Sequence, residues 1–502
     1  MSQQSNNRRI AYNTILLYIR MLIVTLIGLY TSRVILLTLG IEDFGLYNVV
    51  GGVVSLFSFF RSSMERCTQR FLNVEMANHG SGLSKVFNTA LLIHIGLAII
   101  ALILLETIGL WFLNAYIQIP EGREFAANVV FQTVIIGLLL TILTIPYSAS
   151  IIAHEHMGLF AIISIIDSVL NLVIAISLIY TGFDKLIFYS LLLLASRLLI
   201  FLLHVLFCTL KYSETKIHLY YDKAKCKDML GYTSWTLLGH AMILGTNNGN
   251  NVLINMFHGV SANAAMAVAN QVNSHILNLT GNFQTAFNPQ ITKSYASGDF
   301  SYLKTLIYAT TKISFFLLLL VVLPLLYNLD YILELWLVKV PKYTDIFCTL
   351  MLTSGIIQAT TAPLNFSIMA TGKIKWFQIL TGIVFISDLF IVYFFFSQGF
   401  SAPTAMWVKV GVMILVAIVR LYYAHKFIPC ITYMDYSLKV VLPLAISTGL
   451  CTVLIMIIPS PTHLINRITF SLIILATSII IAYYCGITKQ ERQIIRKYIK
   501  KR

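Results

Sequence analysis

Long apolar stretches separated by short polar connections run through the whole chain. Each stretch has about 20 or more residues, the length that an α-helix needs to cross the hydrocarbon core of a membrane. The pattern predicts an all-α integral membrane protein with about fourteen transmembrane helices. The predicted spans are 12–37, 45–71, 85–115, 124–152, 157–181, 185–210, 229–257, 262–290, 301–328, 345–371, 374–398, 403–427, 437–459 and 464–486.

Composition supports a membrane protein and excludes a soluble one. Of the 502 residues, 58% are hydrophobic and 11% are charged, whereas soluble proteins have about 45–50% apolar and about 25% charged residues. The cysteines form no C-x-x-C pair, the His154–Glu155–His156 sequence has no further metal ligand nearby, and there is no glycine-rich phosphate loop. We therefore expect no enzymatic activity, no metal and no cofactor.

The net charge of +15 is explained by membrane topology. Basic residues concentrate at 211–227 and 489–502. With the N-terminus inside, the basic residues that fall on the outer side are Arg33, Arg123, Lys185, Lys339, Lys342, Lys409 and Arg467. Cytoplasmic loops of membrane proteins are rich in Lys and Arg, so we expect both termini on the cytoplasmic side and no nucleic-acid partner.

The two halves of the chain resemble each other. Gly40 matches Gly259 at an offset of 219 residues, and Pro146 matches Pro363 at 217. A repeat of six helices predicts two lobes with the same orientation in the membrane and a cavity between them. Rocking of one lobe against the other would give alternating access. The two prolines are hinge candidates. The expected parts are an N-lobe at 1–210, a C-lobe at 211–430, two further helices at 431–487 and a cationic amphipathic tail at 488–502.

The predicted helices form two sets of six, followed by two more. Two motifs occur with them: Leu-Gly-Ile-Glu-Asp-Phe-Gly-Leu-Tyr at 39–47 and Ala-Thr-Gly-Lys at 370–373. In these features the sequence resembles bacterial polysaccharide flippases of the multidrug/oligosaccharidyl-lipid/polysaccharide superfamily, which has a MATE-like fold. The resemblance implies translocation of an undecaprenyl-diphosphate-linked oligosaccharide, as in O-antigen synthesis, from the inner to the outer leaflet of the bacterial cytoplasmic membrane. It also implies that arginines of the cavity hold the diphosphate.

Four arginines fit that role by position. Arg20 and Arg197 lie near mid-membrane, where lipid exposure is expensive, so each contacts either the diphosphate or a carboxylate such as Asp167. Arg61 marks the inner end of the second span, as a headgroup contact or a topology charge. Arg33 lies near the outer end of the first span, as a further headgroup contact or an anchor that reaches the interface.

Three titratable groups inside the spans are candidates for ion coupling. Asp167 and Asp388 lie near mid-membrane, where a carboxylate can bind a proton or a sodium ion. The alternative for each is a hydrogen bond between helices or a pair with an arginine or Lys409. His240 is a third candidate, with a hydrogen-bonded packing role as its alternative.

Two adjacent predicted helices, 229–257 and 262–290, are unusually polar. Their amides and hydroxyls suit sugar hydroxyl groups, although small-residue packing between helices is the alternative. The sugar-cavity candidates are Asn247, Asn251, Asn263, Asn270, Ser274 and Asn278.

Other functions remain open from the sequence. A cation-coupled multidrug antiporter of the same fold would favour an acidic, aromatic pocket. A membrane polymerase or ligase needs catalytic residues on a sizeable outer loop, and the outer loops here are short. A non-transporting component of polysaccharide assembly is a further alternative. The expected partners are the lipid-linked oligosaccharide, the phospholipid bilayer and assembly proteins such as a polysaccharide polymerase, and we expect a monomer.

Overall fold

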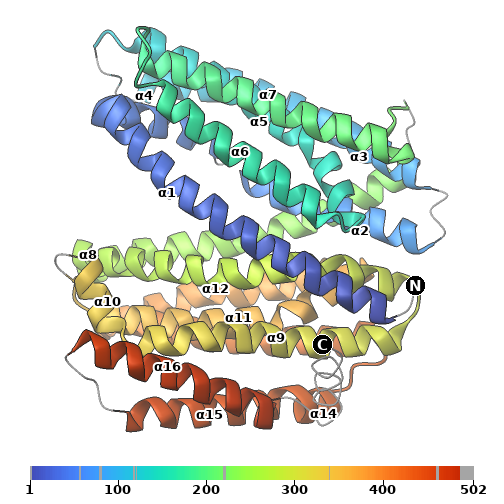
Figure 1. The fold of residues 1–502 in the computed structure, drawn as a ribbon, viewed down its shortest axis with the longest axis vertical. Helices are drawn as coiled ribbons and strands as arrows, with labels where there is room; N and C mark the ends of the chain where they lie inside the picture. The colour runs from blue at the N-terminus through green and yellow to red at the C-terminus, as the bar shows by residue number, and fades with distance from the viewer. Residues whose placement is uncertain are drawn as a thin grey trace. The chain divides into compact units, whose positions relative to one another are not determined.

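The structure is a computed structural model that describes residues 3–55, 58–78, 82–116, 119, 121–218, 222–337, 340–458 and 463–486. In these ranges the regular structure is helical and no strand occurs, which confirms an all-α protein. The chain forms two compact units, Met1–Leu237 and Leu238–Arg502 (Figure 1). The expected cationic tail at 488–502 lies outside the described residues.

Most helices of the first unit follow the predicted spans, whereas the predicted span 45–71 is divided between the helices Gln3–Ser55 and Ser58–Ala77. The helices of this unit are α1 Gln3–Ser55, α2 Ser58–Ala77, α3 Leu83–Leu104, α4 Leu110–Tyr116, α5 Glu124–Ala153, α6 Met157–Ser177 and α7 Lys185–Lys211. The π-helical turn Leu105–Gly109 joins α3 to α4. The buried face of α5 packs against α2, α3 and α7 and carries the fully buried Phe131 and Ile135.

The long helix α8, Lys223–Ala296, begins in the first unit and continues into the second. The other helices of the second unit are α9 Phe300–Tyr327, α10 Leu329–Trp336, α11 Thr344–Thr371, α12 Lys375–Ser397, α13 Thr404–Phe427, α14 Tyr433–Tyr436, α15 Leu442–Ile457 and α16 Leu464–Ile481. Pro363 in α11 and Pro146 in α5 are both buried inside their helices.

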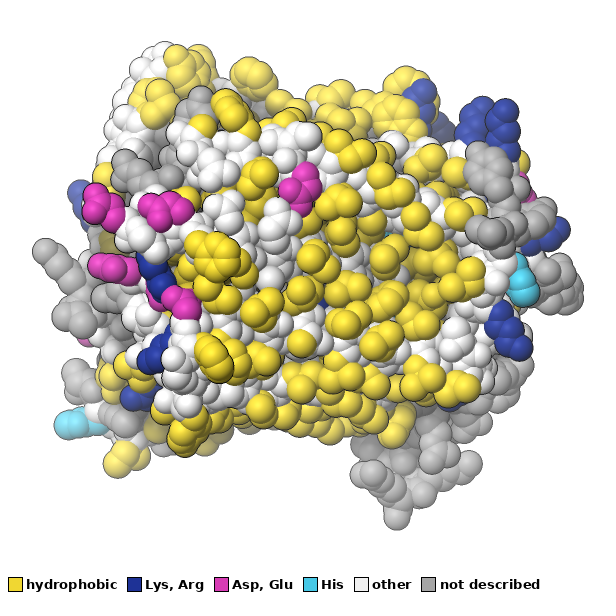
Figure 2. Space-filling view, turned by 90° about the horizontal axis from the view of Figure 1, so that it is seen from above, with side chains coloured by type: hydrophobic (Ala, Val, Ile, Leu, Met, Phe, Trp, Pro, Cys, Tyr) yellow, Lys and Arg dark blue, Asp and Glu magenta, His cyan; other side chains and the backbone are white. Residues whose placement is uncertain are grey.

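Twelve of the described helical segments are long and apolar enough to span a membrane. The segment 223–296 contains two of the predicted spans. The predicted span 45–71 is not among the twelve, and its residues 56–57 lie outside the described residues. Figure 2 shows a broad band of hydrophobic side chains on one face of the molecule, with most charged side chains gathered at two opposite ends of the band. This is the surface expected of a multi-pass membrane protein.

A glycine breaks both long helices at matching positions. Gly40 in α1 has φ 79° and ψ 174°, and Gly259 in α8 has φ 77° and ψ −176°. This region of backbone conformation is open essentially to glycine alone. The two residues are the pair that the proposed repeat places 219 residues apart, so the shared conformation supports the repeat.

An ionic clamp lies at one end of the first unit. Arg123, just before α5, donates to Asp43 from Nε at 2.9 Å and also from Nη2, and its Nη1 donates to Asp184. Asp184 in turn caps α7, because its carboxylate accepts from the Ile187 amide at 3.0 Å. The clamp therefore ties three helices of the unit together at this end.

The clamp changes how its members ionise. Hydrogen bonding to Asp43 is the main reason why the pKa of Arg123 is raised above its usual value. Partial burial opposes ionisation of Asp184, but the hydrogen bonds from the Ile187 amide and from Arg123 outweigh it, so the pKa of Asp184 is lowered. A carboxylate whose pKa is lowered on folding stabilises the folded protein at pH values above its pKa in the unfolded chain. This stabilisation is lost as the pH falls through its pKa in the folded protein.

We predict that Gly40→Ala lowers the free energy of unfolding by about 1–3 kcal/mol, because any β-carbon strains this conformation. Gly28→Ala, in the regular part of the same helix and with nothing within 4 Å of the added carbon, should be neutral or slightly stabilising. Thermal unfolding of the two purified variants in detergent measures the difference. Equal melting temperatures would contradict the strained conformation at Gly40.

We predict that Arg123→Gln destabilises the protein by about 1–2 kcal/mol, because the clamp is partly exposed and its ion pairs are partly screened. The loss of stability should be constant between about pH 5 and 8 and should shrink below about pH 4, as the pH falls from the pKa of an unfolded aspartate toward the lowered pKa of Asp184 in the folded protein. Melting temperatures of wild type and variant across this pH range provide the test. A difference that grows on acidification would refute the assignment.

Candidate functional site

The first unit contains a polar cavity of about 260 Å³ inside its helices. Side chains from α1, α2, α5, α6 and α7 line it. Its polar lining consists of Arg20, Arg61, Thr141, Thr144, Ser148, Ser164, Asp167, Arg197 and His204. Three of the arginines named from the sequence and one of the aspartates thus meet in one cavity, although they are far apart along the chain.

The cavity extends to the middle of the membrane-spanning helices. Arg20 comes eleven residues after Arg9, where the first span begins, which is about 16 Å along a helix. Arg197 precedes the end of its span at Lys211 by about 21 Å on the same scale. Because the hydrocarbon core is about 30 Å thick, both guanidinium groups lie at depths where only a polar cavity can hold them.

Arg197 forms an ion pair with Asp167. Its Nη1 lies 3.2 Å from both carboxylate oxygens. The side chains are 41% and 28% exposed, so water reaches the pair and screens it. Asp167 had been considered as a partner for either Arg20 or Arg197, and the structure pairs it with Arg197.

Arg20 is held without a carboxylate partner within ion-pair distance among the described residues. Its guanidinium carbon lies 4.9 Å from the ring centroid of Phe160, which is a cation–π contact. Its Nε atom is buried and has no hydrogen-bond partner. Glu65 interacts with Arg20 electrostatically while accepting a hydrogen bond from Ser148.

The charge of the cavity is positive. Among the described residues, its lining includes Arg20, Arg61 and Arg197 but only one carboxylate, Asp167. Arg61 is exposed on α2, which places it where a ligand from solvent can reach it. Arg33 is also exposed, and it does not line this cavity.

The second unit holds a different polar cluster, which is drier. Asp388 on α12 is 1% exposed and accepts a hydrogen bond from Asn250 of α8 at 2.5 Å. Lys409 of α13 donates to Asn247 at 3.2 Å and interacts electrostatically with Asp388. One oxygen of Asp388 and the side-chain oxygen of Asn250 are buried without a hydrogen-bond partner.

The other candidates on α8 do not join these two clusters. Ser274 and Asn278 are exposed, whereas Asn251, Asn263 and Asn270 are half-buried. His240 is also half-buried on this helix. Exposing a stripe of polar side chains to hydrocarbon costs free energy. We therefore expect this face of α8 to contact water or protein, not lipid.

Two cations of α13 interact with neighbouring helices. Lys409 is half-buried; it had been counted on the outer side and also offered as a partner for an aspartate, and its amine contacts Asn247 of α8. The second cation, Arg420, was not singled out from the sequence. Arg420 of α13 is 8% exposed and donates to Thr361 at 2.6 Å and to the Gln358 carbonyl at 3.4 Å. Arg420 lies on the sixth helix of its repeat, as Arg197 does, so the repeat itself could have drawn attention to it.

Comparisons with known proteins place the fold. No family model matches the sequence, and none of the curated proteins matches it. Among solved structures, an outward-facing multidrug resistance MATE family transporter of the MOP superfamily is 17% identical, with a TM-score of 0.70 over 85% of this chain and 97% of that one. A MATE protein crystallised in a bent conformation is 16% identical, with a TM-score of 0.72 over 85% and 96%. The chain has the MATE fold.

A further structure of this fold is a MOP superfamily transporter from Pyrococcus furiosus Vc1, whose title states that the reverse polarity of its binding pocket suggests a different function. It is 16% identical, with a TM-score of 0.69 over 85% of this chain and 96% of that one. The likeness confirms the fold of a MATE-like multi-pass membrane protein and leaves the substrate to be argued from this chain's own residues.

We predict that Arg197 and Asp167 are energetically coupled by about 1 kcal/mol, as expected for a partly exposed pair. Arg197→Gln and Asp167→Asn should each destabilise the protein, and the double variant should lose less than the sum of the two. Unfolding in detergent at low and high salt measures the coupling, which should weaken with salt. Strict additivity at low salt would show that the pair contributes nothing.

Proposed function

We propose that the protein is a flippase that moves an undecaprenyl-diphosphate-linked oligosaccharide from the inner to the outer leaflet of a bacterial cytoplasmic membrane. The observation that supports this is the cationic cavity at mid-membrane depth, with Arg20, Arg61 and Arg197 against a single lining carboxylate. A flippase makes no covalent bond. It has to shelter a charged headgroup from hydrocarbon, and a polar cavity inside apolar helices does so.

The available donors suit a diphosphate. A planar guanidinium can donate two parallel hydrogen bonds to phosphate oxygens. Arg197 already shares its donors with Asp167, whereas Arg20 and Arg61 form no ion pair among the described residues. These two arginines therefore bind the diphosphate, and Thr141 and Ser164 add neutral donors at the cavity wall.

The same charge disfavours the rival function. A multidrug antiporter that takes organic cations needs acidic groups to balance the cation. This cavity presents an excess of positive charge, and its one carboxylate is already paired. A net cationic site repels a cation and attracts a diphosphate.

The second unit supplies the remaining parts of the proposal. The polar stripe of α8, with Ser274 and Asn278 exposed, binds the sugar hydroxyl groups. Asp388 is the ion-coupling residue, because one of its oxygens is buried without a partner and its charge is balanced by the nearby Lys409. Both termini lie on the cytoplasmic side, as the distribution of Lys and Arg predicts.

We predict that Arg20→Gln and Arg61→Gln each slow headgroup translocation by about tenfold or more, because each removes a charge-assisted contact to the diphosphate. The protein is reconstituted in liposomes with a fluorescent undecaprenyl-diphosphate oligosaccharide, and bleaching by dithionite reports the leaflet. Arg33→Gln, on the same helix as Arg20 but outside the cavity, is the matched control and should keep the wild-type rate.

Two outcomes would contradict the proposal. Equal rates for wild type and Arg20→Gln, at equal protein per vesicle, would remove the diphosphate role. Transport of organic cations such as ethidium, without any movement of the lipid-linked oligosaccharide, would favour the antiporter instead.

A further inference from the structure

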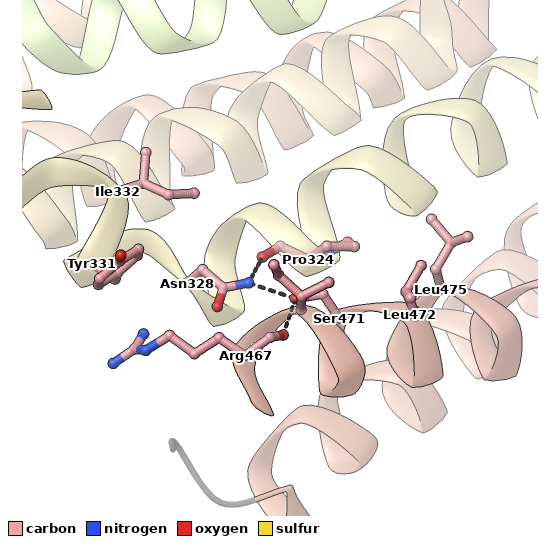
Figure 3. A pocket seen from close by; sticks show the side chains of 9 residues that line it. Pro324, Asn328, Tyr331, Ile332, Arg467, Ser471, Leu472 and Leu475 are labelled. Atoms are coloured by element: carbon pink, nitrogen blue, oxygen red, sulfur yellow. Dashed lines mark hydrogen bonds between the residues drawn. The ribbon is translucent and has the colours of Figure 1, made fainter. Parts of the chain in front are cut away.

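A second cavity, of about 380 Å³, lies on the surface of the second unit between the end of α9, the short helix α10 and the first half of α16 (Figure 3). Most of its lining is apolar, and Ile468 and Leu472 on its wall are 52% and 61% exposed. Its volume lies in the range of small-molecule sites. Because exposed apolar side chains of a membrane-spanning helix face lipid, an acyl chain is the ligand that this wall fits.

One end of this cavity is polar and carries unsatisfied groups. Arg467 reaches past Asn328 toward Tyr331 (Figure 3), and its guanidinium carbon lies 4.9 Å from the ring centroid. Asn328 donates to Ser471 at 2.7 Å and to the Pro324 carbonyl at 2.8 Å. The Nε atom of Arg467 and the side-chain oxygen of Asn328 are buried without a hydrogen-bond partner. The guanidinium N–H groups of Arg467, which lines the cavity, are therefore the donors that this end offers to an anionic ligand.

The charge of the cavity is unbalanced. Its lining includes Arg467 and no carboxylate, and Arg467 forms no ion pair within the part of the chain that the structure describes. An arginine that only anchors a helix at the interface places its charged head in water. Here Nε is buried beside an apolar groove and the cation rests on an aromatic ring, which is the arrangement of a binding site for an anionic headgroup with a hydrocarbon tail.

We propose that this cavity binds an anionic glycerophospholipid such as phosphatidylglycerol. Its phosphodiester accepts hydrogen bonds from Arg467, and one acyl chain lies along Leu472 and Leu475. A zwitterionic lipid fits less well, because the described residues that line the cavity include no carboxylate to hold its ammonium group. The site is separate from the arginine cavity of the first unit and does not depend on the identity of the transported substrate.

We predict that the purified full-length protein binds phosphatidylglycerol more tightly than phosphatidylethanolamine, and that Arg467→Gln weakens phosphatidylglycerol binding by about tenfold. Native mass spectrometry counts the bound lipids, and melting temperatures during lipid titration give the apparent affinity. Lys342→Gln is the matched control, because Lys342 is an exposed cation of the same unit that lies 4.9 Å from the ring centroid of Tyr343. It should bind phosphatidylglycerol like the wild type.

A second variant separates binding from folding. Leu472→Trp fills the groove and leaves the charge of Arg467 in place, so this variant should also lose the bound lipid. Arg467→Lys keeps a positive charge and should retain part of the affinity. Unchanged phosphatidylglycerol binding in both Arg467→Gln and Leu472→Trp would overturn the proposal. Equal, Arg467-dependent binding of phosphatidylethanolamine would overturn the anionic selectivity. A change from dimer to monomer in Arg467→Gln, with no effect on lipid, would overturn the lipid site and identify the face as a contact between two copies.

Discussion

The cost of taking a charge out of water governs the interior of this protein. An isolated ion in hydrocarbon is so unfavourable that every charged side chain within a span needs water, a counter-charge or both. In the first unit this need explains why Arg20, Arg197 and Asp167 from three different helices meet in one polar cavity. Each of these charged side chains depends on the others, because none of them could lie at this depth in the membrane alone.

The two units meet the same requirement in different ways. In the first, the Arg197–Asp167 pair remains in contact with water, which lowers the desolvation cost and keeps the cavity open to a polar ligand. In the second, Asp388 is almost fully buried and is stabilised by Asn250 and by the nearby Lys409. The two units thus carry one wet, cationic site and one dry, nearly neutral one.

Much of the fold could be predicted, because a membrane imposes a length and an apolar composition that are visible residue by residue. The elbow at Gly40 was also visible through its match with Gly259. Arg20 and Asp167 could be identified as functional candidates, because they are charged residues within apolar spans. The sequence offered Asp167 as a partner for either Arg20 or Arg197, and which arginine it pairs with could not be predicted, because pairing depends on how helices rotate against one another. The same limit applies to Lys409, which was counted on the outer side and offered as a partner for an aspartate, and whose contact with Asn247 was not foreseen.

The way in which Arg20 is held decides what its cavity can bind. A carboxylate partner would use the hydrogen-bonding edge of the guanidinium, and an incoming phosphate would have to displace it. Phe160 instead contacts Arg20 through the face of its ring, which stabilises the cation without using its N–H groups. The positive charge is therefore tolerated at depth while donors stay available. A cavity built to bind cations would need the opposite arrangement, with carboxylates left free and arginines paired.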